Sequence, residues 1–358
     1  MKYLLRVNLD IKDEKIRESL RFKSVVFTVK KISKKNNKII ILSHRGRPNG
    51  FDKKLSLKPI AKLLSEAIEK KIIFIPDFDF PSIKNRIDQS INGSILMIEN
   101  LRFLGGEQNN NRILSRTLAG LGDVFINDDF ATAHRKNASN VGITEFIKSI
   151  KGPVFENEIK SLTRVIRQPK HPFLLVIGGA KMSDKLGVMN NLIKRVDNVV
   201  LGGGVANTFL KAQGFDIDKS IFEPEVLGLA KKMAKNRKII MPVDYKKIKD
   251  RILDIGPRTI KIYSKLIRDA KTIIWGGPLG LYEDKRFSHG SFGVAKAISK
   301  SKAFAVVGGG ETSQIIMRLG LEDKIDLVST GGGAMLDFLA GKKMPAIDAL
   351  KNKNRNKK

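Results

Sequence analysis

Short runs of β-branched and other apolar residues recur along almost the whole chain, and they constrain the fold more than any other feature. They alternate little between polar and apolar positions, which is typical of strands buried on both faces. Amphipathic stretches separate them, as expected for strand–helix–strand units in parallel sheets. The runs are residues 3–7, 39–42, 72–75, 95–98 and 124–126, then 173–177, 198–201, 239–241, 272–275, 303–307 and 325–328. We therefore predict an α/β protein with two Rossmann-like layers, each a parallel sheet flanked by helices.

A chain of 358 residues is long enough for two domains. The best boundary lies near residues 151–153, where a helix-like stretch over 143–150 meets Gly152-Pro153. A second helix-like stretch follows over 155–167. We predict an N-terminal domain over 1–150 and a C-terminal domain from 151 to about residue 339.

Composition excludes several classes of protein. The chain has no cysteine, so disulfides, thiolate metal sites and cysteine nucleophiles are absent. Its apolar runs are far shorter than the ~20 residues of a membrane helix, and residues 1–10 carry charges where a signal peptide would be apolar. We expect a cytoplasmic protein without a membrane partner.

The net charge of +31 is the unusual feature of the composition. Such an excess attracts polyanions such as nucleic acid, anionic membranes or phosphorylated metabolites. Most of it is dispersed in pairs and triplets, however, and residues 351–358 form the one continuous basic block. Nucleic acid is therefore an alternative partner that no motif supports.

Basic residues follow the predicted strands of the first half. Arg6 lies within the first run and Arg21 opens the next helical stretch, while His44, Arg47, Arg102 and Arg135 follow later runs. Ligands of open α/β sheets bind at the carboxyl ends of strands, and guanidinium groups suit carboxylates and phosphates. This half is therefore predicted to bind an anion.

Glycines take the same positions in the second half. They occur at 178–179, 202–204, 276–277, 308–310 and 331–333. Glycine lets backbone N–H groups approach a ligand closely, and the following helix N-terminus favours phosphate. Five such turns indicate a nucleotide or phosphate site, although neither a P-loop nor a dinucleotide-binding fingerprint is present. An anion site beside a nucleotide site is what phosphoryl transfer between a small acid and a nucleotide requires, and an anionic acceptor needs no general base.

The chain resembles phosphoglycerate kinase over about residues 5–350. The resemblance rests on ordered motifs: Ser43-His-Arg-Gly-Arg-Pro48, Glu99-Asn-Leu-Arg-Phe103, Asn127-Asp128, Thr132-Ala-His-Arg135, Gly178-Gly-Ala-Lys-Met-Ser-Asp-Lys185, Asp254-Ile-Gly-Pro257 and Ser329-Thr-Gly-Gly-Gly-Ala334. It implies two domains that close about a hinge, with the segment from about 340 to 358 packed back on the N-terminal domain. It also implies a monomer that transfers a phosphoryl group reversibly from 1,3-bisphosphoglycerate to Mg-ADP, giving 3-phosphoglycerate and ATP.

The resemblance also assigns residues. Asn8, Asp10, Arg21, His44, Arg47, Arg102 and Arg135 match positions that bind 3-phosphoglycerate, and Arg21, Lys181 and Lys185 match catalytic positions. Those matching the nucleotide site are Gly179, Lys181, Lys185, Gly203, Gly204, Glu283, Gly310, Glu311, Thr312, Gly331, Gly332 and Gly333, with Glu311 near a bound Mg²⁺.

The chain departs from the family pattern at a few positions. The family's Arg-Val-Asp-x-Asn is Arg6-Val-Asn-Leu-Asp10 here, and Asp129 replaces a small apolar residue. In the second half Gly276 replaces an asparagine, and Glu311 replaces an aspartate. Two alternatives to an active phosphoglycerate kinase follow: a weakened paralogue that binds polyanions, or a kinase for another small acid.

Overall fold

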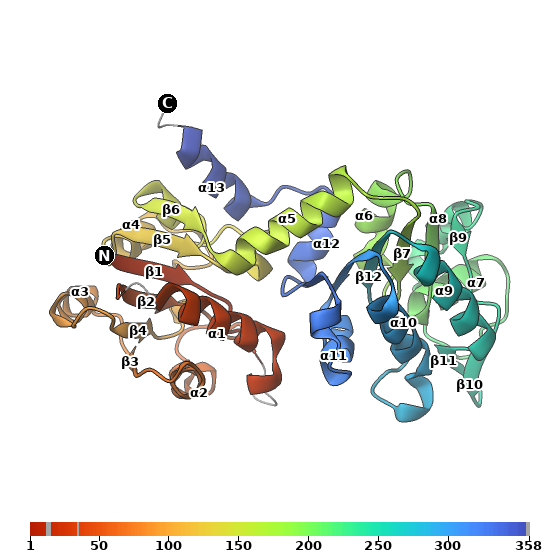
Figure 1. Ribbon diagram of the computed structural model, residues 1–358, viewed down its shortest axis with the longest axis horizontal. Helices are drawn as coiled ribbons and strands as arrows, with labels where there is room; N and C mark the ends of the chain where they lie inside the picture. The colour runs from red at the N-terminus through yellow and green to blue at the C-terminus, as the bar shows by residue number, and fades with distance from the viewer. Residues whose placement is uncertain (12–15, 34–35, 356–358) are drawn as a thin grey trace. The chain divides into compact units, whose positions relative to one another are not determined.

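The computed structural model describes residues 1–11, 16–33 and 36–355. The chain forms two compact units, each with its own sheet (Figure 1). Unit 1 comprises Met1–Glu158 and Lys343–Lys358, and unit 2 comprises Ile159–Lys342. Both main sheets are six-stranded and parallel. The predicted α/β fold is therefore confirmed, as are all eleven predicted strands, whose ends shift by a residue or two.

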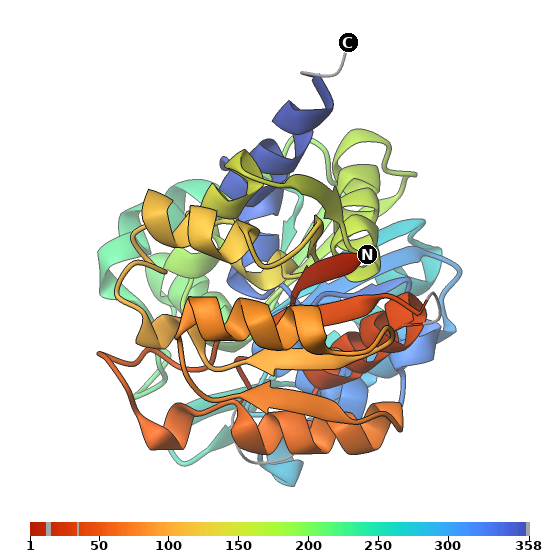
Figure 2. The same ribbon diagram turned by 90° about the vertical axis from the view of Figure 1, so that its left-hand side faces the viewer.

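The sheet of unit 1 has the strand order β3-β4-β2-β1-β5-β6 (Figures 1 and 2). Alternate residues of its central strands face opposite ways: Leu5 packs with helices α1 and α2, and Leu4 packs with α3 and α4. The strands are β1 (Lys2–Arg6), β2 (Lys38–Leu42), β3 (Ile72–Ile75), β4 (Ile95–Ile98), β5 (Val124–Asn127) and β6 (Lys148–Lys151), and the helices are α1 (Leu20–Ile32), α2 (Lys58–Ile68), α3 (Phe80–Gln89) and α4 (Arg112–Ala119). Burial on both faces explains why the strands other than β6 are largely apolar.

Strand β6 corrects the sequence prediction. Residues 143–150 have a helix-like pattern, yet the structure has the short 3₁₀ helix η6 (Gly142–Glu145) followed by β6 (Lys148–Lys151), which pairs with β5. The strand is at the edge of the sheet, where Ser149 is buried and Ile150 is exposed. Pairing with a neighbouring strand decided the conformation of this segment, because its own sequence is too short and polar to do so.

Helix α13 (Pro345–Arg355) belongs to unit 1, although it is the last element of the chain. It lies against β6 and η6, and the amide of Ala346 donates to the carbonyl of Ala133 at 3.1 Å. Helix α5 (Pro153–Arg167) runs from the end of unit 1 into unit 2.

The sheet of unit 2 has the order β14-β13-β12-β7-β8-β9. Its central strands pack with α9, α10 and α11 in one core that surrounds the buried Trp275, while α6 and α12 lie against each other. The strands are β7 (Phe173–Ile177), β8 (Asn198–Leu201), β9 (Ile239–Ile240), β12 (Thr272–Gly276), β13 (Phe304–Gly308) and β14 (Leu327–Val328). The helices are α6 (Ser183–Leu192), α7 (Gly203–Ala212), α8 (Leu227–Met233), α9 (Pro257–Asp269), α10 (His289–Lys300), α11 (Gly310–Arg318) and α12 (Gly333–Leu339).

Unit 2 also contains an antiparallel hairpin that the sequence did not predict. Its strands are β10 (Tyr245–Ile248) and β11 (Arg251–Ile255), joined by a turn in which Lys249 has a φ of 48°. The remaining elements are the short 3₁₀ helices η1 (Ile16–Glu18), η3 (Lys53–Leu55), η4 (Leu101–Phe103), η5 (Phe130–Thr132), η7 (Pro224–Val226), η8 (Lys285–Phe287) and η9 (Glu322–Lys324). Among the described residues, no helix has the length and apolar character needed to cross a membrane.

The strand orders predict where ligands bind. In each sheet the chain first places strands on one side of a central strand and later returns to place strands on its other side. This reversal lies between β1 and β5 in unit 1 and between β7 and β12 in unit 2. A crevice forms beyond the carboxyl ends of strands at such a reversal, because the flanking loops diverge there.

Candidate active site

The carboxyl ends of the strands in unit 1 bring together most of the basic residues predicted to bind an anion. Burial lowers the pKa of His44 well below its usual value, and the positive charges of Arg6, Arg102, Arg21 and Arg135 lower it further. Four guanidinium groups are therefore close enough to this imidazole to act on its charge, and Arg6 contacts it directly. A cluster of like charges favours an anionic ligand, because the ligand neutralises their repulsion.

Arg6 is the buried centre of this cluster. Its Nη1 lies 3.0 Å from Oδ2 of Asp129, its Nε donates to Oγ of Ser139 at 2.9 Å, and its Nη2 is 2.7 Å from Nδ1 of His44. A guanidinium group has only donors, so Nδ1 of His44 must accept and the ring proton is on Nε2. His44 is therefore a neutral imidazole whose remaining donor is Nε2–H.

Asp10 holds the loop that carries His44 and Arg47. Its Oδ1 accepts from the amide of Gly46 at 2.8 Å, and its backbone carbonyl accepts from Nη1 of Arg21 at 2.6 Å. Arg102 donates to the carbonyl of Gly46 and lies 4.0 Å from Oδ2 of Asp10. Burial lowers the pKa of Arg102 to about 10, which still leaves it charged at neutral pH.

The remaining predicted acid-site residues differ in how accessible they are. Arg47 is exposed, and Arg135 is half-buried with its Nε 3.2 Å from Nε2 of His134. Asn8 is only 7% exposed, its Nδ2 donates to Oδ1 of Asp129 at 2.9 Å, and its Oδ1 accepts from the amide of Asp10 at 3.1 Å. Its amide is thus already engaged within the protein, and its role as a substrate ligand stays a prediction.

Sequence reasoning did not find the buried groups behind these side chains. Ser139 donates to Oε1 of Glu107 at 2.6 Å, so a second carboxylate lies behind Arg6. Asp129 stands out in the sequence only because it replaces a small apolar residue of the family pattern, and the structure pairs it with Arg6. The sequence did offer one signal for the pairing of Asp129, namely that a charged residue closely follows the buried strand β5.

In unit 2 the glycine-rich strand ends open into a cleft of about 650 Å³. That volume suits a ligand of nucleotide size. Six residues predicted to bind the nucleotide line it: Lys185, Gly310, Glu311, Thr312, Gly332 and Gly333. The rest of its lining is Ser183, Asp184, Gly187, Val188, Gly276, Gly277, Gly308, Gly309, Leu336, Asp337, Ala340 and Lys342.

Lys185 is the half-buried cation of this cleft. Burial lowers the pKa of its ammonium group, while Asp184 and Glu311 act in the opposite direction. Lys181 is exposed just before α6, where Glu223 accepts from both the amide and the hydroxyl of Ser183, at 2.8 and 2.5 Å. Glu223 thereby stabilises the start of the helix that carries Lys185.

Close backbone packing explains the glycines at the reversal point of unit 2. A Cβ on Gly178 would lie 2.1 Å from the carbonyl oxygen of Pro278, so no other residue fits there without moving backbone. Gly203 has a φ of +58° and lies against the backbone of Gly179, with Gly204 against Ala180. These predicted residues bring α7 close to the turn after β7.

The other predicted nucleotide residues stand around the same strand ends. Thr312 is buried and its Oγ1 accepts from the amide of Gly277 at 2.8 Å, while the amide of Gly331 donates to Oγ of Ser329 at 3.0 Å. Glu283 is exposed and follows Tyr282, whose hydroxyl donates to Oε1 of Gln314 at 2.8 Å. Glu283 does not line the cleft described above.

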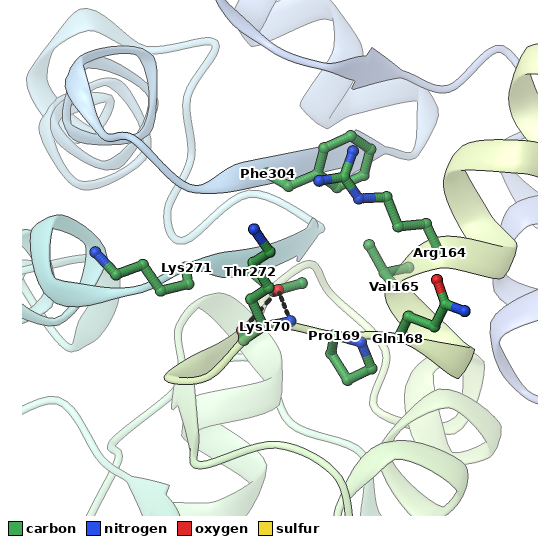
Figure 3. A pocket seen from close by; sticks show the side chains of 8 residues that line it. All are labelled: Arg164, Val165, Gln168, Pro169, Lys170, Lys271, Thr272 and Phe304. Carbon is green, nitrogen blue, oxygen red and sulfur yellow. Dashed lines mark hydrogen bonds between the residues drawn. The ribbon is translucent and has the colours of Figure 1, made fainter.

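A much smaller cavity of about 10 Å³ lies at the opposite, amino-terminal ends of β12 and β13 (Figure 3). Oγ1 of Thr272 bonds both the amide and the carbonyl of Lys170, at 2.9 and 2.8 Å, and the guanidinium of Arg164 lies 3.9 Å from the ring centre of Phe304. This space holds no more than a water molecule. The contacts around this cavity hold the end of α5, and the segment that follows it, against the sheet.

Comparisons with known proteins agree with this arrangement. An anion site of arginines in one α/β unit and a glycine-built phosphate cleft in the other define a nucleotide-dependent phosphotransferase. The sequence profile of the family "Phosphoglycerate kinase" matches residues 2–342. The chain belongs to the phosphoglycerate kinase family, and it is a kinase of the glycolytic type with a carboxyl group as acceptor.

Relatives match along nearly their whole length. The phosphoglycerate kinase of Pseudothermotoga lettingae is 41% identical over 98% of this chain and 96% of its own. The crystal structure of the Pyrococcus horikoshii enzyme has a TM-score of 0.89 at 31% identity, covering 99% of this chain and 96% of its own. The Coxiella burnetii structure has a TM-score of 0.84 at 37% identity, covering 98% and 96%.

Proposed function

We propose that this chain transfers a phosphoryl group reversibly from 1,3-bisphosphoglycerate to Mg-ADP, using the anion cluster of unit 1 for the acid and the glycine-rich cleft of unit 2 for the nucleotide. The observation that carries the assignment is the set of Arg21, Arg102 and Arg135, whose positive charges act on His44, behind which the buried Arg6 contacts Nδ1 of the ring. A small ligand with both a carboxylate and a phosphate matches these donors best.

Within unit 1, we assign binding of 3-phosphoglycerate to Asn8, Asp10, Arg21, His44, Arg47, Arg102 and Arg135. Arg21 also contacts the transferring group. Its Nη1 bonds the carbonyl of Asp10, which limits the side chain to one direction. Fixed guanidinium groups stabilise charge that spreads over phosphoryl oxygens, because they need no reorientation during the reaction.

Within unit 2, the assigned nucleotide ligands are Lys181, Lys185, the backbone at Gly179, Gly203, Gly204, Gly310 and Gly331–333, and the side chains of Glu283, Glu311 and Thr312. The start of α11 at Gly310 lines the cleft and offers N–H groups to phosphate oxygens. Lys185 contacts the migrating phosphoryl group, since it is a half-buried cation in that cleft.

Mg²⁺ enters with the nucleotide as part of the substrate. In the described part of the chain no three acidic or histidine side chains are grouped so that they could hold a metal ion themselves. Mg²⁺ is usually held by substrate phosphates and one or two carboxylates, and Glu311 in the cleft fits that pattern. When bound, the ion neutralises part of the phosphate charge.

The chemistry needs no general base, because the acceptor is already an anion. Arginine and lysine side chains neutralise charge, and closure about a hinge brings acid and nucleotide together while water is excluded. We further propose that the enzyme acts as a monomer in the cytoplasm, where ATP and ADP are exchanged, without a membrane partner.

A coupled assay of ATP consumption with 3-phosphoglycerate and Mg²⁺ tests the proposal. We expect turnover that falls at least a hundredfold in Arg21→Ala and in Lys185→Ala, with unchanged thermal unfolding. Turnover retained in both variants would contradict the assignment. Parallel assays with other small phosphorylated acids test the alternative of a different acid substrate, which predicts a lower KM for one of them.

A further inference from the structure

Asp129 is a fully buried carboxylate at the start of the loop after β5, beside the end of β1. Its Oδ2 lies 3.0 Å from Nη1 of Arg6 and accepts from Oγ1 of Thr132 at 2.7 Å. Its Oδ1 accepts from Nδ2 of Asn8 at 2.9 Å and from the amide of Thr132 at 3.2 Å. Both oxygens are satisfied from within the protein, so this carboxylate is not a substrate ligand.

Arg6 depends on this carboxylate for charge balance. Its side chain is 2% exposed, and a buried guanidinium without a counter-charge is strongly unfavourable. Glu107 is connected to Arg6 only through Ser139, which accepts from Nε of Arg6 and donates to Glu107. The direct ion pair with Asp129 therefore fixes the guanidinium at the carboxyl end of β1.

Arg6 in turn fixes His44. Its Nη2 lies 2.7 Å from Nδ1 of the ring, whereas Oδ2 of Asp129 is 4.0 Å from the same nitrogen. Arg6 therefore stands between the carboxylate and the imidazole. A donor at Nδ1 leaves the ring proton on Nε2, the nitrogen that remains for a ligand.

We infer that Asp129 is a positioning residue of the acid site: it holds Arg6 against His44, and Arg6 keeps the ring as a neutral Nε2–H donor toward the substrate. The inference rests on the proposed role of His44 in binding 3-phosphoglycerate. It assigns the buried pair Asp129–Arg6 to substrate affinity and leaves nucleotide binding in unit 2 independent of it.

Asn8 makes the inference sharply testable. It donates to Asp129, so a carboxylate at position 8 would face that of Asp129 at hydrogen-bond distance. Two carboxylates so close cannot both be ionised at neutral pH. The pair 8/129 therefore accommodates one negative charge, and the inference predicts that a carboxylate at position 8 can supply it when that of Asp129 is removed.

The experiment compares wild type, Asp129→Ala, Asn8→Asp and the double variant Asn8→Asp with Asp129→Ala. We expect Asp129→Ala to raise the KM for 3-phosphoglycerate at least tenfold, and Asn8→Asp, in which one of the two carboxyl groups takes up a proton, to raise it less. The KM for ATP should change less than twofold in both variants. The double variant should return the KM for 3-phosphoglycerate to within about threefold of wild type. Asp129→Asn, which keeps the volume without the charge, replaces Asp129→Ala if that variant does not fold.

A spectroscopic readout separates positioning from general stability. The chain has four histidines, so ¹⁵N signals of the His44 ring can be assigned by comparison with His44→Gln. Wild type and the double variant should show the neutral Nε2–H tautomer at pH 7, and Asp129→Ala or Asp129→Asn a mixture of tautomers.

Either of two results would overturn the inference. One is a wild-type ring protonated on Nδ1 or charged at pH 7. The other is a double variant that is folded but binds 3-phosphoglycerate no better than Asp129→Ala. Failure of the proposed function is distinguishable, because His44→Gln would then leave 3-phosphoglycerate affinity unchanged while the ring spectra still report whether Asp129 controls the tautomer.

Discussion

The two units reach anion recognition by opposite means. Unit 1 uses charged side chains, with Arg6 and Asp129 buried and paired behind the groups that face the ligand. Unit 2 uses backbone, with glycines at strand ends and the start of α11 along a cleft of about 650 Å³. The side-chain site depends on the balance of charges and their partners. The backbone site depends on the absence of a Cβ at its glycines, so an added side-chain atom there disturbs it directly.

The largest expected effect comes from removing the positive charge that Lys185 contributes to the cleft of unit 2. Lys185→Ala should lower kcat about a thousandfold, equivalent to about 4 kcal/mol, because it removes a half-buried cation from the phosphoryl group. Steady-state kinetics measure this, with Lys261→Ala as a control on an exposed part of α9. Equal activity in the two variants would show that the cleft works through backbone alone.

The second largest effect is expected from adding one methyl group to a glycine of the backbone site in unit 2. Gly178→Ala places a Cβ 2.1 Å from the carbonyl oxygen of Pro278, so we expect a loss of stability of about 3 kcal/mol and weaker ATP binding. Denaturant unfolding and ATP titration measure both. Gly228→Ala is the matched control, because a Cβ there meets no atom within 4 Å and α8 favours alanine over glycine.

The pH dependence of stability compares one buried acid in each unit. Burial raises the pKa of Asp128 in unit 1 and of Asp254 in unit 2 from 3.8 to about 6. Between these pH values the folded state keeps a proton that the unfolded state releases, so stability falls as pH rises from about 4 to 6. Each group contributes at most about 3 kcal/mol to that fall.

Chemical unfolding of wild type, Asp128→Asn and Asp254→Asn from pH 4 to 7 tests this expectation. The stability of wild type relative to each variant should decrease as pH rises through 6. Asp284→Asn is the control, since Arg286 lowers the pKa of this exposed acid and gives it a weak dependence of opposite sign. A relative stability that is constant with pH would contradict the raised pKa values.

The smallest expected effect tests how much the side-chain site depends on shape rather than charge. Arg102→Lys keeps the positive charge but loses the planar donors that bond Gly46 and approach Asp10. We expect the KM for 3-phosphoglycerate to rise about tenfold, equivalent to about 1.4 kcal/mol. Arg286→Lys, on an exposed pair with Asp284, should change neither KM; a similar rise in both variants would show that charge density alone matters.

Local patterns predicted most of the fold. All eleven apolar runs form strands, because a strand buried on both faces is apolar at every position and can be recognised from a few consecutive residues. The predictions failed where this pattern weakens. Strand β6 is at a sheet edge with Lys148 and Ile150 exposed, and the β10–β11 hairpin has a largely polar sequence. Partner strands decide such segments, and a local pattern does not contain them.

The sequence by itself determined the two parallel sheets and the chemistry at their strand ends: arginines and histidine in one half, glycines and lysines in the other. Strand order and polarity bring those ends to one edge of each sheet, so the residues directly after the strands already indicate the ligand class.

Only the tertiary structure decided how the buried charges are paired. Asn8 and Asp129 are 121 positions apart, and the substitutions at these positions appear unrelated until β1 and β5 lie side by side. Burial then makes the contact of Asp129 with Arg6 obligatory, because a charge removed from water must find its partner inside the protein. The need to pair a buried charge is met by residues that are distant in the sequence, so no local sequence pattern reveals it.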